Sequence, residues 1–369
     1  MMERFARLPA VVVHIVQMQM RIAYSRLLVI CGFCCVIPLR SQSRSDFPRT
    51  PWGGYPYGAS YDAEIADPDV HRVLFENEHV MFLEVANPPE LDVKMHGHPY
   101  PSVFARDTGA GPTTGGGVGR AAGIPLDDTH LEADSPFAGK GWGQGGPPAG
   151  LQFPRCTTAP PEGPHRPLNH NTVPVHFYRI EFRRLDAEGL RGHWKEWYPW
   201  MLKPTKAVRN LTPGPALGPN VSEEWPYSRL YDSVLAAPDN YQLLYEDGHV
   251  RLLEVSVRPG ETTPMHGHPY ASVLAFDAVA DPRDIVDTKL DPNSPLNGQG
   301  AGHGPAPNMF NMTAPTCTTV GAMAPHSIRN KGDVPLHYYR IEFKRVDGEA
   351  LGSHWQEWYP WMKYMKNMR

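Results

Sequence analysis

The hexapeptide MHGHPY occurs twice in this chain, at Met95–Tyr100 and again at Met265–Tyr270. Each copy lies inside a longer repeat with the same order of blocks. The other matching blocks are His71–Val85 with Tyr241–Val255, and Val173–Met201 with Val334–Met362. Each copy spans about 140–150 residues, which exceeds the roughly 20–50 residues of a solenoid repeat. The pattern therefore indicates a duplicated domain.

The composition indicates a globular protein that is rich in loops. Of the 369 residues, 41% are hydrophobic and 20% are charged, which excludes a disordered chain. The net charge is only -4 and no basic cluster is present, so the sequence does not predict nucleic-acid binding. The 34 glycines and 40 prolines supply many turns and disfavour an all-helical fold.

Short strands are predicted in each copy. Runs such as HVRLLEVSV (His249–Val257), SVLAF (Ser272–Phe276) and PLHYYRIEF (Pro335–Phe343) are bounded by turn residues. Many short strands separated by turns favour a sandwich or barrel. We expect two domains, at residues 50–202 and 225–369, and a Pro/Gly-rich linker at residues 203–224. Helical periodicity is confined to the ends of the copies.

The N-terminal segment, residues 1–45, has the pattern of an export signal. Arg21 and Arg26 precede an apolar run from Leu27 to Leu39, which is too short to span a bilayer. The alternatives are a buried helix or an N-terminal extension upstream of the true start at Met20. Export predicts a secreted or periplasmic protein with no stable membrane span in its mature form.

The repeated histidines have the spacing of metal ligands. Residues i and i+2 of a strand point to the same face, so His96 and His98 project side by side, and His266 and His268 do the same. Each pair needs one further ligand from a neighbouring strand. His165 and His326 occupy equivalent positions in the blocks PHRPLN and PHSIRN and are the candidates for that third ligand.

These motifs resemble those of the cupin superfamily. GETTPMHGHPYASV supplies Gly260, His266 and His268 at the spacing of the first cupin motif, and His326 with Asn330 fits the end of the second. The first copy matches at His96, His98, His165 and Asn169, except that Glu90 stands where the motif has glycine. The resemblance implies a bicupin, which is an all-β chain of two tandem jelly-roll barrels with a few short helices.

The resemblance also implies the metal sites. His96, His98 and His165 would bind one metal, and His266, His268 and His326 another, with Asn169 and Asn330 supporting them. Serine or valine stands where the family has its metal-binding glutamate, so each site is predicted to have three histidines. Imidazole ligands suit divalent transition metals, with Fe or Cu favoured and Ni, Zn or Mn as alternatives.

Further candidates for a catalytic role occur in pairs. Tyr100 and Tyr270 follow the HxHP motif and could orient a substrate, or pack at the barrel rim. His176 and His337 could act as a general base, or be packed strand residues. Cys156 and Cys317 could form one bridge, or be small buried residues.

The resemblance to three-histidine cupins favours a metal-dependent oxidoreductase, dioxygenase-like, that acts on a small anionic or bidentate substrate. Alternatives are an exported binding protein for a metal or small ligand without catalysis, and a metal-dependent isomerase or lyase. Fusion of the copies predicts that the two halves pack as a pseudo-dimer.

Overall fold

The computed structural model describes residues 55–107, 126–135, 143–145, 154–170, 173–184, 189–202, 225–278, 282–297, 315–345 and 351–368. All of them belong to one compact unit, Arg49–Arg369. The predicted export segment at residues 1–45 and the predicted linker at residues 203–224 lie outside the described residues. Among the helices that are described, none combines the length and the apolar character that a membrane span requires.

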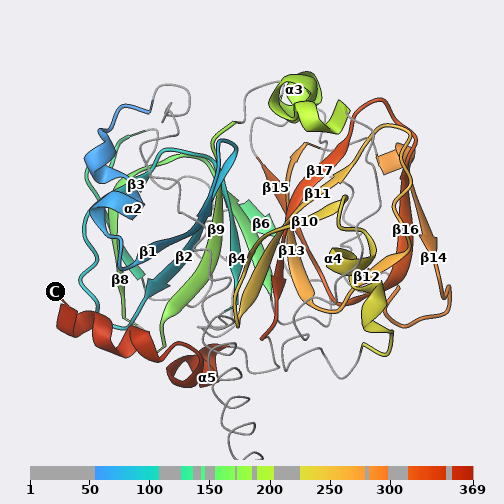
Figure 1. The fold of residues 1–369 in the computed structure, drawn as a ribbon. Helices are drawn as coiled ribbons and strands as arrows, with labels where there is room; N and C mark the ends of the chain where they lie inside the picture. Colours follow the sequence, from blue (N-terminus) through green and yellow to red (C-terminus); the bar gives the residue numbers. More distant parts are fainter. Residues whose placement is uncertain are drawn as a thin grey trace, which may run out of the picture. The chain divides into compact units, whose positions relative to one another are not determined.

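The first half, residues 55–202, contains two antiparallel sheets (Figure 1). One has six strands in the order β1-β2-β9-β4-β7-β6, and the other has the order β3-β8-β5. The strands are β1 (His71–Glu76), β2 (Val80–Asn87), β3 (His96–His98), β4 (Ser102–Arg106), β5 (Leu126–His130), β6 (Gly143–Gly145), β7 (Arg155–Ala159), β8 (Glu162–Asn169) and β9 (Val175–Phe182).

The second half, residues 225–368, repeats this arrangement. Its larger sheet has the order β10-β11-β17-β13-β15, and its smaller sheet has the order β12-β16-β14. The strands are β10 (Tyr241–Glu246), β11 (Val250–Val257), β12 (His266–His268), β13 (Ala271–Ala278), β14 (Ile285–Lys289), β15 (Thr316–Val320), β16 (Met323–Asn330) and β17 (Leu336–Phe343). The predicted all-β fold of two tandem jelly-roll barrels is therefore confirmed.

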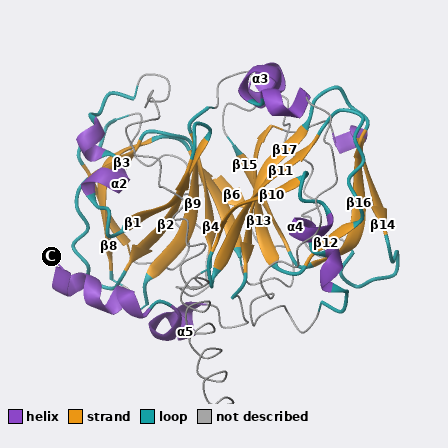
Figure 2. Cartoon of the chain, in the orientation of Figure 1, coloured by secondary structure: helices purple, strands orange, loops and turns teal. Residues whose placement is uncertain are grey.

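The helices are short and lie before the first strand and after the last strand of each half (Figure 2), apart from one 3-10 turn before β14. They are η2 (Ala59–Tyr61), α2 (Ala63–Ala66), α3 (Gly189–Trp197), η3 (Pro199–Leu202), η4 (Arg229–Tyr231), α4 (Ser233–Ala236), η5 (Pro282–Asp284), α5 (Leu351–Trp358) and η7 (Pro360–Met368).

Strand β2 shows how the core is built, because both of its faces are buried. Val80 and Phe82 belong to a hydrophobic cluster that also contains Leu252 and Ile341 of the second half. Met81 and Leu83 point to the opposite face and belong to a second cluster, which lies mainly in the first half. A strand buried on both faces needs a continuous apolar run, which explains the sequence VMFLEV.

The helical segment at the end of each half packs against the other half. Tyr359, Met362 and Met365 of the C-terminal segment join the core cluster of the first half. In the opposite direction, Trp194, Tyr198 and Met201 form a cluster against which Val334 packs. The phenolic oxygens of Tyr359 and Tyr178 lie 3.0 Å apart, and those of Tyr198 and Tyr339 lie 3.1 Å apart. The aromatic block that ends each copy thus covers the other copy.

A covalent link also joins the halves. Cys156 on β7 and Cys317 on β15 form a disulfide across a sequence separation of 161 residues. The two cysteines therefore form the bridge that was one of the sequence alternatives. Cys156 is also buried, as the other alternative stated.

Candidate metal centres

Each HxH motif forms a three-residue strand, β3 or β12, at the edge of the smaller sheet. All three residues of each strand are buried. The middle residue favours glycine, because a Cβ on Gly97 would clash with the Tyr55 hydroxyl, and one on Gly267 would lie 2.9 Å from the Trp225 ring. The motif therefore places two imidazoles on one face and the backbone close to the neighbouring strand.

Strand pairing brings the third histidine to this face. His96 is the register partner of His165 on β8, and His266 is the register partner of His326 on β16. The ring centroids of these pairs lie 4.7 Å apart in both halves. Residues far apart in the sequence thus meet through the pairing of two short strands.

The Nδ1 atom of each of these imidazoles is engaged by an oxygen. In the first half, Nδ1 of His96 lies 2.8 Å from the Lys94 carbonyl, Nδ1 of His98 lies 2.8 Å from Glu181, and Nδ1 of His165 lies 3.1 Å from Asp128. Because the acceptors are oxygens, Nδ1 carries the proton and Nε2 keeps its lone pair. The same contacts recur in the second half, where the acceptors are Pro264, Glu342 and Asp287.

Three of the Nε2 atoms are buried without a hydrogen-bond partner in the protein. They belong to His165, His268 and His326. Ligand atoms of His266, His268 and His326 lie within 4.8 Å of one another. Buried polar atoms are normally satisfied, so these convergent lone pairs fit a metal ion. The predicted three-histidine set of the second half is therefore brought together, and the donor set fits a divalent transition metal.

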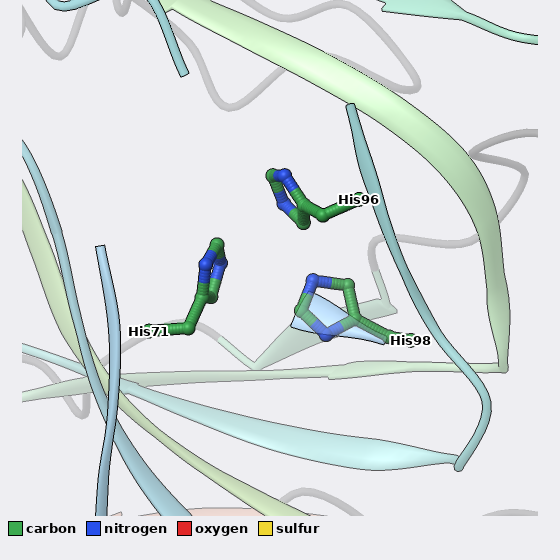
Figure 3. A group of neighbouring side chains, drawn as sticks. All are labelled: His71, His96 and His98. Atoms are coloured by element: carbon green, nitrogen blue, oxygen red, sulfur yellow. The ribbon is translucent and has the colours of Figure 1, made fainter. Parts of the chain in front are cut away.

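The first half contains two potential ligands that the sequence analysis missed. The ligand atoms of His71, His96 and His98 lie within 4.8 Å of one another (Figure 3), as do those of His98, Glu162 and His165. His71 comes from β1 in the larger sheet, and Glu162 begins β8. Since neither belongs to an HxH motif, only the topology places them beside it. The predicted set of His96, His98 and His165 is thus not one such group, because His96 and His165 belong to two different groups that share His98.

The second half differs at both of these positions. Tyr241 begins β10 as His71 begins β1, and its hydroxyl lies 2.7 Å from Nε2 of His266. Met323 begins β16 as Glu162 begins β8. A sequence signal for His71 existed, since it opens one repeat where tyrosine opens the other.

Burial keeps most of the ligand imidazoles neutral. It lowers the pKa of His96, His98 and His268 well below the ordinary value, and that of His266 to about 3. His165 is the exception: burial opposes its charge, but the hydrogen bond and charge of Asp128 raise its pKa. Neutral imidazoles are the form that binds metals.

Charged partners behind the ligands differ between the halves. Arg179 bonds to Glu162 at 2.8 Å and lies 3.0 Å from Glu181. Burial raises the pKa of Glu181 to about 8. In the second half, Glu342 accepts hydrogen bonds from both Arg340 and Arg251. Glu181 and Glu342 bond to Nδ1 of His98 and His268 and so orient these two imidazoles.

The predicted tyrosines and asparagines lie near the motif strands. Tyr100 and Tyr270 are both buried, and the hydroxyl of Tyr270 has no hydrogen-bond partner. Asn169 donates to the carbonyls of Asn87 and Val173. Asn330 makes the corresponding bonds in the second half, to the carbonyls of Val257 and Val334. These amides fix the turn that follows the strand of the third histidine.

His176 and His337 are fully buried and bonded to carboxylates. Nδ1 of His176 lies 2.7 Å from Asp107, and Nε2 lies 3.3 Å from Glu84. His337 makes the same pair of contacts, with Asp277 and Glu254. The structure places neither in a group of potential metal ligands, among the residues it describes.

Each half is thus a pair of antiparallel sheets in which the HxH strand pairs with the strand of the third histidine. The fold is that of a bicupin. The sequence matches no protein-family model and no curated protein sequence.

Solved structures similar to this chain include a cupin domain and two oxalate decarboxylases. A cupin domain from Bordetella pertussis has 16% identity over 28% of this chain and 92% of its own, with a TM-score of 0.20. The oxalate decarboxylase of Lactobacillus farciminis, as its formate complex, has 14% identity over 77% of this chain and 83% of its own, with a TM-score of 0.20. The oxalate decarboxylase of Bacillus subtilis has 11% identity over 74% and 72%, with a TM-score of 0.19.

Proposed function

We propose that this bicupin is a metal-dependent oxidoreductase, dioxygenase-like, that acts on a small anionic substrate. The observation that carries the proposal is that buried Nε2 atoms have no hydrogen-bond partner in either group of potential ligands: that of His165 in the first half, and those of His268 and His326 in the second. A buried polar atom left unpaired costs about 1–3 kcal/mol, and metal binding removes that cost. His96, His98 and His165 would hold a divalent metal in the first half.

The donor set defines what such a metal supplies. Neutral imidazoles leave a divalent ion most of its charge, and Fe or Cu would supply Lewis-acid polarisation of a bidentate oxygen ligand together with redox chemistry toward O₂. The protein's own part is to orient the ligands through Glu181 and Asp128, and to exclude water by burial.

Arg179 supports an anionic substrate. Its side chain is almost fully buried, and its Nη2 atom has no hydrogen-bond partner. It bonds to Glu162, one of the potential ligands, and its charge is among the causes that lower the pKa of His96 and His98. A buried guanidinium with a free donor beside a metal site is suited to bind a carboxylate or enolate oxygen.

Oxygen uptake tests this function. Untagged protein is reconstituted anaerobically with Fe(II) or Cu(II), and O₂ consumption is followed with a thiol carboxylate and with a 1,3-diketone. We expect substrate-dependent uptake that His96→Ala abolishes. Arg179→Lys should raise KM about tenfold or more through loss of a charged hydrogen bond, and Arg340→Lys in the second half is its matched control. Metal content is measured in every variant.

The other functions are outcomes of the same experiment. Metal binding without O₂ uptake, but with conversion of a substrate, would replace the oxidoreductase with an isomerase or lyase. Metal binding without any turnover would leave a binding protein. If the protein binds no metal, the oxidoreductase, the isomerase or lyase and the metal-binding protein are all excluded.

The disulfide supports export. Disulfides persist in oxidising compartments and are rare in the cytosol. Cys156 and Cys317 are bonded in the structure. We therefore propose a secreted or periplasmic location, which fractionation of the host cells and N-terminal sequencing of the mature chain would test. The shared hydrophobic cluster and the exchanged helical segments also support packing of the halves as a pseudo-dimer.

A further inference from the structure

The two metal centres differ at corresponding positions, although the repeats around them are closely similar. His71 and Glu162 in the first half are replaced by Tyr241 and Met323 in the second. Both replacements remove a potential ligand. The ligand atoms of His71 and Glu162 lie within 4.8 Å of those of the motif histidines. The first centre therefore offers a larger donor set than the second.

Tyr241 also competes with a metal for the second centre. Its hydroxyl lies 2.7 Å from Nε2 of His266, whose Nδ1 is already bonded to the Pro264 carbonyl. Since Nδ1 donates, Nε2 is the acceptor and its lone pair is occupied by the Tyr241 hydroxyl. His266 can bind a metal only after this buried hydrogen bond breaks. Both rings are buried, so water does not replace it.

The charged residues around the two centres also favour metal binding at the first centre over the second. Around the first centre, Arg179 pairs with Glu162 and Glu181, and Arg106 and Arg183 add more distant positive charge. Around the second, Glu342 is paired with two buried cations, Arg251 and Arg340, and Arg251 also pairs with Asp232. Near His326, the Lys289 ammonium is paired with Asp287, the acceptor of His326 Nδ1. A divalent cation is repelled by such neighbours in a buried site.

We propose that the two centres are functionally unequal: the first half holds the tight metal site, with His71 and Glu162 as additional ligands, and the second half holds a weak one gated by Tyr241. This inference rests on the proposed metal binding. The first site should bind the metal about tenfold more tightly than the second. The difference arises because metal binding at the second site breaks one buried hydrogen bond, between Tyr241 and His266. Tyr241 and His71 are thus the residues that set which half is loaded at limiting metal.

Competition titration tests the inference without any assay of activity. Metal-free, untagged full-length protein is titrated with Co(II) against a chromophoric chelator, and the visible absorption of bound Co(II) is recorded. We expect two classes of site. His96→Ala should remove the tight class, and His266→Ala the weak class.

Two reciprocal variants make the test specific. His71→Tyr should weaken the tight class about tenfold, and Tyr241→His should tighten the weak class by a similar factor. Tyr241→Phe, which removes the hydroxyl but keeps the ring, should tighten the weak class without adding a ligand. Thermal unfolding of each metal-free variant confirms that it is folded.

The outcomes separate this inference from the proposed function. Two equal sites, or a tight class that is lost in His266→Ala, would overturn the inference and leave metal binding intact. Unchanged affinities in both His71→Tyr and Tyr241→His would also overturn it. Absence of any Co(II) binding would overturn both.

Discussion

The hydroxyl of Tyr241 lies 2.7 Å from Nε2 of His266, at the place in the second half that His71 takes in the first. The relationship shows how two nearly identical motifs can form different sites. The hexapeptide MHGHPY is identical in the two copies, whereas its neighbour on the facing sheet is a potential ligand, His71, in one and a hydroxyl donor, Tyr241, in the other. The chemistry of each site therefore depends on a residue outside the motif.

The disulfide between Cys156 and Cys317 should contribute strongly to stability. Cys156→Ser/Cys317→Ser is expected to lower the free energy of unfolding by about 2–5 kcal/mol, because the bridge closes a long loop. Urea denaturation with and without a reductant measures this. The reductant should lower the stability of the wild type to that of the variant and leave the variant unchanged. Equal wild-type stability in both conditions would contradict the prediction.

Stability should fall as the pH rises from about 6.5 to about 9. Burial opposes the charge of His176 and His337, but Asp107 and Asp277 prevail and raise the pKa of each histidine to about 9. Below pH 6.5 both folded and unfolded states are protonated, so the full contribution is present. Between the two values only the unfolded state loses its proton, and about 3 kcal/mol per histidine is lost.

Urea denaturation between pH 6 and pH 9.5 checks this pH dependence. The other charged or titratable groups around the two histidines include Glu84, Glu254, Tyr178, Tyr198, Tyr339, Tyr359, His249 and His79. His176→Gln/His337→Gln keeps these groups and removes the titration. The wild type should lose several kcal/mol more than this variant over the range, and parallel curves would show that the histidines are not responsible.

Glu90 has a positive φ of 55°, and Gly260 has a φ of 76° at the corresponding turn. Each main-chain N–H donates to an asparagine carbonyl, at 2.8 Å for Glu90 and 2.9 Å for Gly260. Glu90→Gly should raise the free energy of unfolding by about 1 kcal/mol, and Gly260→Ala should lower it by about 1–2 kcal/mol. Thermal or urea unfolding measures both.

Glu90→Ala is the control for the turn, because it removes the exposed contact with His170 but keeps the positive φ. It should leave stability nearly unchanged, since exposed ion pairs contribute little. An added Cβ at Gly260 would meet nothing within 4 Å, so a loss in Gly260→Ala reports backbone conformation alone. A stabilising Gly260→Ala would contradict the interpretation.

The exchanged C-terminal segment should be essential to the first half. Met362 is fully buried in the core cluster of that half, whereas Tyr364 on the same segment is 54% exposed. Met362→Ala should cost about 2–5 kcal/mol through cavity formation. Tyr364→Ala should cost less than about 0.5 kcal/mol. Similar losses in the two variants, measured by urea denaturation, would show that the segment does not pack as described.

The fold was predictable from the sequence because its signals are local. Short apolar runs between turn residues predicted strands, and the repeated blocks predicted the duplication. The HxH spacing also placed His96 beside His98, since side chains in a strand alternate. These inferences need only the geometry of one strand.

The remaining parts of the site depend on tertiary structure. His71 reaches the site from the other sheet, and Glu162 is the register partner of His98 on a strand far along the chain. Neither spacing nor composition encodes those contacts. The packing of each helical segment against the other half could not be predicted either, because the composition of the aromatic block does not indicate which half it covers.

Metal analysis by mass spectrometry tests the central claim most directly. Untagged protein, reconstituted with excess Fe(II) and then desalted, is compared with His96→Ala and His266→Ala. We predict stoichiometric metal in the wild type, with about one equivalent lost from the first half in His96→Ala and any weaker occupancy lost in His266→Ala. A folded wild-type protein that retains no metal would contradict the assignment of both histidine clusters as metal centres.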